Sequence, residues 1–570
     1  MKKPVIEFRN YSFKYNSQIE PSLHNLNLTI YEGEKVLIVG PSGSGKSTIG
    51  QCLNGLVPFS YKGEVTGSLT IKGQEAKELD IFTLAKMVGT VLQDPDGQFI
   101  GLTVGEDIAF TLENDCVEQE QMAQIVRDTA KMVDMESYLK ASVHHLSGGQ
   151  KQRVSLAGVM VDEVDILLFD EPLANLDPTT GKSAIELIDQ IHKQMNKTIV
   201  IIEHRLEDVL HKDVDRIIVI DDGRIVADDN PDALLASPIL EQYHIREPLY
   251  VKAAKHAGCT LTEEMRPAHM HTFELKNCKE KLVEWYESVE RGSKVEQTSP
   301  ILDAQHLSFA YQRDQKMIHD LSFTIQKGEM VSIVGKNGAG KSTLIKLICG
   351  FEKLQSGKLF FNGKDVTEDS IKERALRIGM VMQNPNHMIS KNMIFDEVAL
   401  GLTIRGVPEN EIQERVEQTL KVCGLYPFRN WPISALSFGQ KKRVTIASIL
   451  VLEPEILILD EPTAGQDLRH YTEIMEFLVE LNRQGMTIMM VTHDMHIMLE
   501  YTPRAIVITD GQIIADDSSS AVLTDRALIQ QANLKETSLF ELAERIGIHK
   551  PKEFVDRFIS FDREERKRWQ

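Results

Sequence analysis

The sequence is written twice, and this internal repeat limits the folds that the chain can adopt. GPSGSGKST, which begins at Gly40, recurs as GKNGAGKST, which begins at Gly335. Four further pairs follow in the same order: LQDP and MQNP, LSGGQKQRV and LSFGQKKRV, LLFDEP and LILDEP, and EHR and THD. Lys46 and Lys341 are 295 residues apart, and the later pairs are 289 to 290 residues apart. Such a regular duplication predicts two domains of the same fold in tandem.

The ends of the two copies also match, and they set the domain boundaries. IREPLYVKAAKHAGC, which begins at Ile245, aligns with LKETSLFELAERIGI, which begins at Leu534. Each copy therefore has about 255 residues. We predict a first domain over residues 1–260, a polar linker without strong periodicity over 261–299, a second domain over 300–549 and a charged C-terminal extension over 550–570.

Short apolar segments in each copy predict the fold class. In the first copy, Lys35 to Val39 leads into the glycine-rich loop, and a helix is expected to begin at Ser47. The segments from Ile166 to Phe169 and from Thr198 to Ile202 are continuously apolar, as strands of a parallel sheet are when both faces are buried. The pattern predicts an α/β core with helices on both faces of a mainly parallel sheet.

Composition excludes several functions. The net charge of −20 disfavours a nucleic-acid-binding surface, because such surfaces are basic. The absence of any C-x-x-C pair among the six cysteines favours reduced thiols over zinc or iron–sulfur sites. The N-terminal residues MKKPVIEF do not resemble a signal peptide. No segment approaches the roughly 18 apolar residues of a spanning helix, so we expect any membrane role to be peripheral and to need a partner.

The two glycine-rich loops match the pattern G-x-x-x-x-G-K-[ST], which is a specific signal for phosphate binding. Glycines let backbone N–H groups turn towards the β- and γ-phosphates, and the lysine adds a positive charge. The serine can ligate Mg²⁺, and the following helix directs its positive end at the anion. The loops predict two sites for ATP with Mg²⁺. The candidate ATP-binding residues are Gly40, Pro41, Ser42, Gly43, Ser44, Gly45, Lys46, Ser47 and Thr48, and Gly335, Lys336, Asn337, Gly338, Ala339, Gly340, Lys341, Ser342 and Thr343.

Four apolar residues followed by Asp-Glu form a second constellation, at Asp170-Glu171 and at Asp460-Glu461. A buried strand would deliver both carboxylates to its C-terminal end, where ligands bind in such sheets. The aspartate suits the Mg²⁺ shell, and the glutamate can polarise the attacking water. In isolation the pattern is usually just a strand end. Its place about 120 residues after a phosphate loop makes it a candidate catalytic pair.

LSGGQ at Leu146 to Gln150 and LSFGQ at Leu436 to Gln440 resemble the signature of the ABC ATPases. The resemblance covers nearly the whole chain, twice. It implies two tandem P-loop ABC-type ATPase domains, each with a mainly parallel sheet core, a β-rich adenine-side lobe and a helical signature subdomain. In that family each ATP lies between the phosphate loop of one half and the signature of the other. Phe438 departs from the pattern, because it replaces the third-position glycine.

The resemblance also implies roles for single residues. Gln93 and Gln383 match the loop glutamine that senses Mg²⁺ or the attacking water. His204 and His493 match the histidine that senses the γ-phosphate, although a histidine after a strand is otherwise a turn residue. The remaining matches are Tyr15 and Tyr311 for adenine stacking, Asp177 and Asp467 for the segment that crosses between halves, Ser147, Gly148, Gly149, Gln150, Ser437, Phe438, Gly439 and Gln440 for the signature, and Ser47, Gln93, Asp170, Ser342, Gln383 and Asp460 for Mg²⁺.

The sequence after Gln93, QDPDGQFIGLTVGEDIAF, resembles the ATPases of energy-coupling-factor importers for vitamins and metals. This resemblance implies integral membrane partners, namely a transmembrane coupling protein and a substrate-binding membrane protein, and a peripheral location on the cytoplasmic face of the cell membrane. A fused pair resembles the ATPases of thiamine or hydroxymethylpyrimidine uptake.

Two acidic pairs fall near the groove where coupling helices dock in those importers, at Glu106-Asp107 and Asp396-Glu397. Alternatively, they only complement a helix dipole. The second copy, QNPNHMISKNMIFDEVAL, lacks the DGQF element, so we expect unequal grooves that suit a partner with two different helices.

The alternative function is that of a soluble tandem-cassette ATPase that acts on ribosomes. Such a protein also has two cassettes, a linker and no membrane segment. The short linker, which is not strongly basic, the acidic net charge and the importer-like groove sequence favour the importer subunit.

Overall fold

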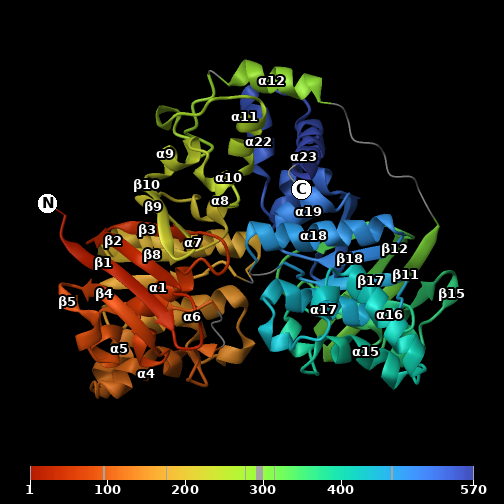
Figure 1. Ribbon diagram of the computed structural model, residues 1–570, viewed down its shortest axis with the longest axis horizontal. Helices are drawn as coiled ribbons and strands as arrows, with labels where there is room; N and C mark the ends of the chain where they lie inside the picture. The colour runs from red at the N-terminus through yellow and green to blue at the C-terminus, as the bar shows by residue number, and fades with distance from the viewer. Residues whose placement is uncertain are drawn as a thin grey trace. The chain divides into compact units, whose positions relative to one another are not determined.

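The chain forms two compact units, which Figure 1 shows in a computed structural model. The structure describes residues 2–93, 97–174, 176–276, 278–289, 299–312, 315–463 and 466–568, without the side chains of 312, 315, 316, 567 and 568. Unit 1 comprises Met1–Glu287 with Glu544–Gly547, and unit 2 comprises Ser288–Ala543 with Ile548–Gln570. Both units have the predicted α/β class.

Unit 1 contains two sheets. An antiparallel sheet has the order β2-β1-β4-β5, and a six-stranded sheet has the order β10-β9-β3-β8-β7-β6 with only β10 antiparallel to its neighbour. The strands are β1 (Pro4–Tyr15), β2 (Leu23–Tyr31), β3 (Lys35–Val39), β4 (Gly63–Ile71), β5 (Gln74–Glu75), β6 (Val88–Val91), β7 (Ile166–Asp170), β8 (Thr198–Ile202), β9 (Arg216–Asp221) and β10 (Arg224–Asp229).

The six-stranded sheet is buried on both faces, which explains its continuous apolar strands. Leu167 and Phe169 of β7 pack in one core with the helices that follow β6, whereas Ile166 and Leu168 pack in another with the antiparallel sheet. The helices of unit 1 are α1 (Lys46–Leu53), α2 (Leu56–Phe59), α3 (Ile81–Ala85), α4 (Val104–Asn114), α5 (Gln119–Met132), α6 (Gly148–Met160), α7 (Pro178–Met195), α8 (Leu206–Val209), α9 (Pro231–Ala236), α10 (Ile239–Gln242), α11 (Leu249–His256) and α12 (Lys279–Ser288).

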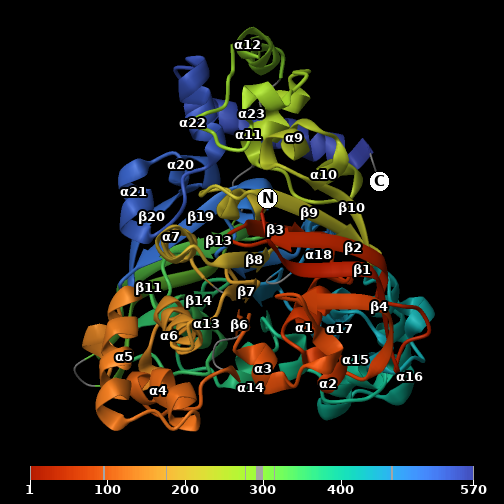
Figure 2. The same ribbon diagram turned by 90° about the vertical axis from the view of Figure 1, so that its left-hand side faces the viewer.

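Helices lie at two opposite ends of unit 1, while α1 and α7 lie beside the strands (Figure 1). Figure 2 shows α4 and α5 at the end of the unit opposite α9 and α11, with the sheets between them. The helical subdomain expected from the signature is therefore α4, α5 and α6, where α4 and α5 each contact α6. The phosphate loop lies between β3 and α1, at the C-terminal edge of the parallel strands.

Unit 2 repeats this arrangement with the sheet orders β12-β11-β14-β15 and β16-β17-β18-β13-β19-β20. Its strands are β11 (Pro300–Gln312), β12 (Gln315–Gln326), β13 (Met330–Val334), β14 (Ser356–Phe361), β15 (Lys364–Asp365), β16 (Ile378–Val381), β17 (Ile456–Asp460), β18 (Thr487–Val491), β19 (Arg504–Thr509) and β20 (Gln512–Ser518). Its helices are α13 (Lys341–Cys349), α14 (Ile371–Arg374), α15 (Ile394–Ile404), α16 (Glu409–Val422), α17 (Phe438–Leu450), α18 (Leu468–Arg483), α19 (Met495–Tyr501), α20 (Ser519–Val522), α21 (Arg526–Ala532), α22 (Ser538–Ile546) and α23 (Pro551–Arg568).

Much of the segment predicted as a polar linker, 261–299, is folded onto unit 1. Leu261, Phe273 and Leu282 are buried, and Tyr250 of α11 donates a hydrogen bond from its hydroxyl to the carbonyl oxygen of Pro267 at 2.7 Å. The compact part of unit 1 thus extends to Glu287 rather than to residue 260. The apolar residues of this segment lack a regular period, which is why the sequence pattern suggested a linker.

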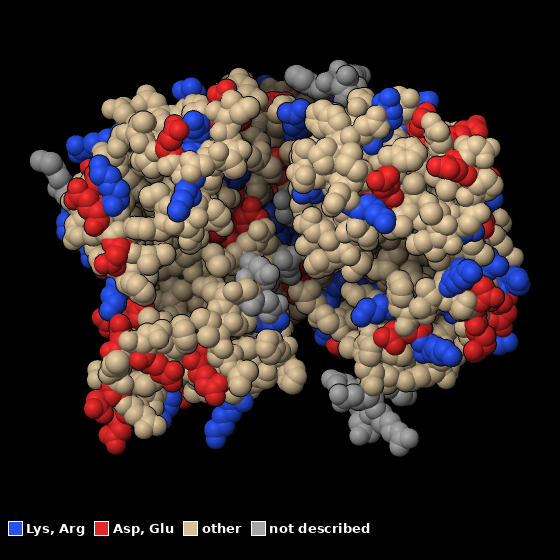
Figure 3. Space-filling model, turned by 60° about the horizontal axis from the view of Figure 1, so that its bottom comes forward, with Lys and Arg blue, Asp and Glu red and all other residues tan. Residues whose placement is uncertain are grey.

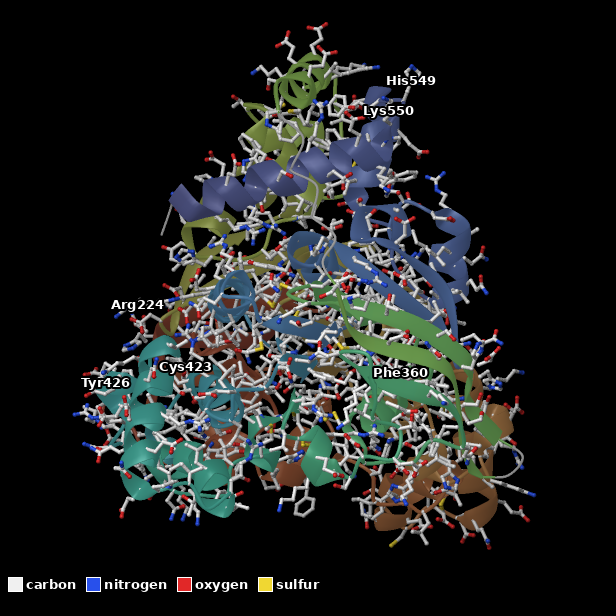
Figure 4. All side chains as sticks on the ribbon, turned by 90° about the vertical axis from the view of Figure 1, so that its right-hand side faces the viewer. Arg224, Phe360, Cys423, Tyr426, His549 and Lys550 are labelled. Carbon is white, nitrogen blue, oxygen red and sulfur yellow. The ribbon has the colours of Figure 1, made fainter. Side chains whose placement is uncertain are left out.

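The predicted charged extension, 550–570, contains helix α23, which buries Phe554, Val555 and Phe558 in unit 2. Figure 4 marks His549 and Lys550 in the turn that joins α22 to α23. The side chain of Arg566 forms ion pairs with Glu500 of α19 at 3.0 Å and with Asp562 at 2.7 Å. Helix α23 is therefore an integral part of unit 2.

The six cysteines are free thiols, and all except Cys116 are buried. Cys423, which Figure 4 marks beside Tyr426, lies in the apolar core of the helical subdomain of unit 2. Burial raises the pKa of the Cys423 thiol to about 12, so the thiol is protonated and unreactive at neutral pH. None of the helices in the described ranges combines the length and apolar character that a bilayer crossing needs.

Candidate active site

The first phosphate loop forms a ring of backbone around a buried lysine. Lys46 begins α1 and donates hydrogen bonds from Nζ to the carbonyl oxygens of Gly40 at 2.9 Å and Pro41 at 2.8 Å. Lys341 does the same in unit 2, with the carbonyl oxygens of Gly335 at 2.7 Å and Lys336 at 2.9 Å. Ser47 and Ser342, the predicted Mg²⁺ ligands, directly follow these lysines, and both serines are exposed.

Two glycines of each loop are required by the backbone. Gly45 caps α1 with a φ of 103°, a left-handed conformation that favours glycine. A side chain on Gly40 would bring its Cβ to 2.1 Å from the carbonyl oxygen of Ile220. Gly340 and Gly335 have the same roles in unit 2, since Gly340 has a φ of 102° and a Cβ on Gly335 would lie 1.9 Å from the oxygen of Ile508.

The tyrosines predicted to stack on adenine lie beside the helices that follow the phosphate loops. The Tyr15 hydroxyl is 3.1 Å from Thr48 Oγ1, and the Tyr311 hydroxyl is 3.4 Å from Thr343 Oγ1. Tyr311 is half exposed, which leaves ring surface open to solvent. Both positions fit an adenine contact next to the phosphates.

Strand β7 delivers the first carboxylate pair to the loop, and Glu171 there joins two other predicted site residues. Gln93 donates a hydrogen bond from Nε2 to Glu171 Oε2 at 2.5 Å, and His204 Nε2 lies 3.1 Å from Glu171 Oε1. Burial, together with the charges of Glu171 and Glu203, raises the pKa of the Asp170 carboxyl to about 6. A nearby cation, such as the predicted Mg²⁺, would stabilise the charged form of a desolvated carboxylate of this kind.

The second pair has the same arrangement but a wider spacing. His493 Nε2 is 3.5 Å from Glu461 Oε1. Burial, together with the charge of Asp460, raises the pKa of the Glu461 carboxyl to about 8. Burial also raises the pKa of Asp460. Gln383 lies in the matching loop, where its carbonyl oxygen accepts a hydrogen bond from Lys442 Nζ at 2.7 Å.

Both glutamates have an unusual backbone conformation. The φ of Glu171 is 49° and that of Glu461 is 46°, in the left-handed region that non-glycine residues rarely adopt. Their N–H groups continue the sheet, since Glu171 donates to the carbonyl oxygen of Ile202 and Glu461 to that of Val491. The conformation turns each side chain out of the strand and towards the histidine of the neighbouring strand.

The signature motifs are helix starts with complete capping boxes. Ser147 Oγ accepts a hydrogen bond from Gln150 N–H at 3.4 Å, and Gln150 Oε1 accepts one from Ser147 N–H at 2.9 Å. Ser437 and Gln440 form the same pair at the start of α17. The cap explains why serine and glutamine are spaced by three residues.

The departure at Phe438 is accommodated without strain. A Cβ added to Gly148 would only meet Leu176 at 3.5 Å, an ordinary contact, and the Phe438 side chain is exposed. At the next position a Cβ on Gly149 would lie 2.3 Å from Thr180 Cγ2, so that glycine is required. Gly439 is also buried, but a Cβ there would lie 3.2 Å from His470 Cδ2, a tight contact and not a clash.

The predicted crossing segments begin α7 and α18. Asp177 caps α7 by accepting a hydrogen bond from Thr180 N–H at 2.9 Å, and Asp467 caps α18 by accepting one from His470 N–H at 2.8 Å. Asn175 and Gly465, at which the two sequences also differ, lie outside the described residues, as does the Asp96 of the DGQF element.

Three of the four carboxylates in the acidic pairs accept hydrogen bonds from backbone N–H groups. Asp107 Oδ1 accepts hydrogen bonds from Ile100 N–H and Gly101 N–H, and Glu106 Oε2 accepts one from Thr103 N–H as part of a capping box. Glu397 is buried and accepts from Ser390 N–H and Lys391 N–H. Glu106 caps the start of α4, whereas Asp107 and Glu397 hold the loop that precedes their own helix.

Sequence reasoning missed three polar residues that shape the sites. Glu203 and Lys442 are buried next to the carboxylate pairs, and each occupies a position where the two copies differ in residue type. Gln98 of the DGQF element closes the loop after β6, because its Nε2 donates to the carbonyl oxygen of Thr90 at 2.9 Å and its Oε1 accepts from Leu92 N–H at 3.3 Å. The sequence signal for these three residues is that each occupies a position where the two copies differ.

The sequence is similar to known protein families and to individual proteins. The sequence matches the ABC transporter family over residues 23–174 and 318–464, and a family described as ATP-binding cassette cobalt transporter over residues 237–309. A presumed ABC transporter ATP-binding protein of Clostridium perfringens (strain 13 / Type A) is 58% identical over 562 residues, which cover 99% of each chain.

A second relative and one solved structure are also similar to this chain. A presumed ABC transporter ATP-binding protein of Enterococcus faecalis (strain ATCC 700802 / V583) is 58% identical over 567 residues, 99% of this chain and 100% of that one. The solved structure of cbiO1 from Clostridium perfringens, described as part of the ABC transporter complex cbiONQ, is 35% identical, covers 43% of this chain and 99% of its own, and has a TM-score of 0.39.

Proposed function

Because the chain belongs to the ABC transporter ATPases, with two ATPase domains that bind and hydrolyse ATP, we propose that it energises a membrane importer of the energy-coupling-factor type. The observation that carries the proposal is the match to the ATP-binding cassette cobalt transporter family over residues 237–309. This stretch contains α10, α11 and α12, which lie outside the two ATPase matches.

The phosphate loops and carboxylate pairs would hold ATP with Mg²⁺. In unit 1, Lys46 and the loop N–H groups would bind the phosphates, and Ser47, Gln93 and Asp170 would surround the metal ion. In unit 2, Lys341, Ser342, Gln383 and Asp460 would do the same. The ion would neutralise charge on the phosphates, and the raised pKa of the buried Asp170 fits a partner of positive charge.

Hydrolysis would use the protein's own groups at the attacking water. Glu171 would polarise the water as it attacks the γ-phosphate, and His204, 3.1 Å away, would orient that carboxylate. Glu461 and His493 would act likewise in the second site. By the family resemblance, Ser437 and Gly439 would complete the first site, and Ser147 and Gly149 the second.

The docking surface for the membrane partner would be the loop that the acidic residues hold. In unit 1 this loop presents two apolar side chains, Ile100 at 64% and Leu102 at 73% exposure. The matching residues of unit 2, Ser390 and Asn392, are polar and exposed. In the view of Figure 3, uncharged residues form most of the visible surface. Two unlike surfaces suit a partner with two unlike helices.

The transported compound would be a vitamin, a vitamin precursor such as thiamine or hydroxymethylpyrimidine, or a metal ion. No substrate passes through this subunit, so its sites do not select among these compounds. The location would be peripheral, on the cytoplasmic face of the membrane.

The test is affinity purification of the full chain from detergent-solubilised membranes, followed by identification of the bound proteins. The expected result is a multi-span coupling protein together with a small membrane protein that binds the substrate. Expressed without them, the chain is expected to stay in the supernatant after ultracentrifugation. Co-sedimentation with ribosomes and no membrane partner would overturn the proposal in favour of the ribosome-acting class.

A further inference from the structure

Three side chains in unit 1 hold the short backbone segment that follows Glu171. Gln152 on α6 donates a hydrogen bond from Nε2 to the carbonyl oxygen of Pro172 at 2.5 Å. Glu203 Oε2 accepts one from Leu173 N–H at 3.0 Å, and Arg205 Nη1 donates one to the carbonyl oxygen of Leu173 at 3.0 Å. We call Gln152, Glu203 and Arg205 the clamp.

Glu203 joins the two backbones that carry the reacting pair. Its side chain is buried, and its second oxygen, Oε1, accepts hydrogen bonds from His204 N–H at 2.8 Å and Arg205 N–H at 3.2 Å. One carboxylate therefore binds both the chain after Glu171 and the chain at His204. The same two chain segments carry His204 and Glu171, whose Nε2 and Oε1 atoms lie 3.1 Å apart.

Unit 2 has a different residue at all three clamp positions, namely Lys442, Thr492 and Asp494. Lys442 donates hydrogen bonds to the carbonyl oxygens of Met382 and Gln383, both at 2.7 Å. Thr492 Oγ1 accepts from Asp494 N–H at 3.0 Å, and Asp494 caps α19. Thr492 thus repeats one contact of Glu203, the one to the N–H group two residues later, whereas Lys442 binds a different segment from Gln152. The pair of Glu461 and His493 is wider, at 3.5 Å.

We propose that Glu203 is a positioning residue for ATP hydrolysis at the site of unit 1, where it holds Glu171 and His204 in the reacting geometry, and that Thr492, which has one side-chain oxygen instead of two, does not take this role at the matching position of unit 2. The inference rests on the proposed roles of Glu171 and His204. Glu203 acts through the backbone, because its oxygens accept from Leu173, His204 and Arg205. Displacement of a reacting group by about 1 Å lowers a rate by about 100-fold, so small backbone shifts are sufficient.

The experiment replaces Glu203 in the full chain and measures Mg²⁺-dependent ATP hydrolysis. Glu203→Thr introduces the residue of unit 2, and we expect kcat to fall by about tenfold or more while the KM for ATP changes by less than about threefold. Glu203→Gln keeps the shape and one acceptor oxygen, so its kcat is expected to lie between that of the wild type and that of Glu203→Thr.

Glu34→Gln is the matched control. Glu34 is as buried as Glu203, with 3% exposure, but it precedes β3 at the opposite edge of the sheet, where it binds Tyr31 N–H and Arg216. This variant is expected to lose thermal stability without a fall in kcat. The fraction of chains that bind ATP without Mg²⁺ corrects every kcat for misfolded protein.

Each variant is also made with Glu461→Gln, which removes the carboxylate of the second site. If Glu461→Gln alone stops turnover, the sites are coupled, and the loss from Glu203→Thr appears in the otherwise unchanged chain. If turnover persists, the loss appears in the Glu461→Gln chain. An unchanged kcat in both backgrounds, or a fall that only follows the ATP-binding fraction, overturns the inference.

Glu171→Gln in the same assay distinguishes a failure of the role of Glu203 from a failure of the role of Glu171. If Glu171→Gln lowers the rate and Glu203→Thr does not, only the role of Glu203 fails. If neither substitution lowers the rate, the proposed role of Glu171 fails as well.

Discussion

His204 Nε2 lies 3.1 Å from Glu171 Oε1 at the C-terminal edge of the parallel sheet of unit 1. If this carboxylate polarises the attacking water, Glu171→Gln together with Glu461→Gln should lower ATP turnover by on the order of 100-fold or more. ATP binding should persist, because the phosphate loops are unchanged. Steady-state hydrolysis and equilibrium nucleotide binding measure the two quantities, and wild-type turnover in the double variant would contradict the assignment.

The raised pKa of Glu461 predicts a pH-dependent penalty in the nucleotide-free protein. Its pKa of about 8 exceeds the ordinary value near 4.5, so between these pH values the folded chain holds a proton that the unfolded chain has released. This difference favours unfolding progressively as pH rises from about 4.5 to about 8.

Glu461→Gln should remove that penalty. We expect the variant to match the wild type in thermal stability near pH 4.5 and to exceed it near pH 8, by on the order of 3 kcal/mol. Thermal unfolding without nucleotide at the two pH values measures the difference. The reverse trend, with the gain at low pH only, would contradict the raised pKa.

The loop that α4 holds should be the stronger docking surface. Ile100→Asp with Leu102→Asp should weaken co-purification with the membrane partner about tenfold or more, since each exposed apolar side chain contributes about 1.5–3 kcal/mol when it is buried. Ser390→Asp with Asn392→Asp is the matched variant of unit 2 and should have a smaller effect, because those residues are already polar. Equal losses would refute the asymmetry, and no loss in either would refute the docking site.

The ion pairs of helix α23 should stabilise unit 2. Arg566→Ala would leave Glu500 and Asp562 buried without their guanidinium partner, and breaking a buried pair in this way lowers the free energy of unfolding by about 3 kcal/mol. Lys550→Ala, which removes an exposed partner of Glu553, is the control and should change it by less than about 1 kcal/mol. Chemical denaturation compares the two, and an equal effect would argue against a stabilising role for α23.

The sheets and phosphate loops were predictable because their sequence patterns reflect local requirements. Strand β7 is apolar at four successive positions because both of its faces are buried, and Gly45 must adopt a positive φ. The folded segment before Glu287 was not predictable, since Leu261, Phe273 and Leu282 follow no helix or strand period. Phe273, for example, packs against Tyr250 of α11 with ring centroids 5.9 Å apart, a contact that only the folded chain creates.

The candidate site was predicted residue by residue, but its supporting residues were not. Lys46, Asp170 and His204 occur in recognisable motifs, and the structure places them at one edge of the sheet. Glu203 adjoins His204 in sequence, yet its significance depends on Leu173, which is 30 residues away and comes within 3.0 Å only after folding. For the same reason the backbone partners of Glu106 and Asp107 could not be predicted from the sequence.

The left-handed backbone at Glu171 and Glu461 sets activity against stability. Such a conformation is unfavourable by about 1–2 kcal/mol for a residue with a side chain, and glycine adopts it freely. Glycine at either position would relieve the backbone and delete the carboxylate in one step. A directed-evolution screen that scores heat resistance alone would therefore favour loss of the enzyme's activity at these two positions, so it should be paired with a selection for turnover.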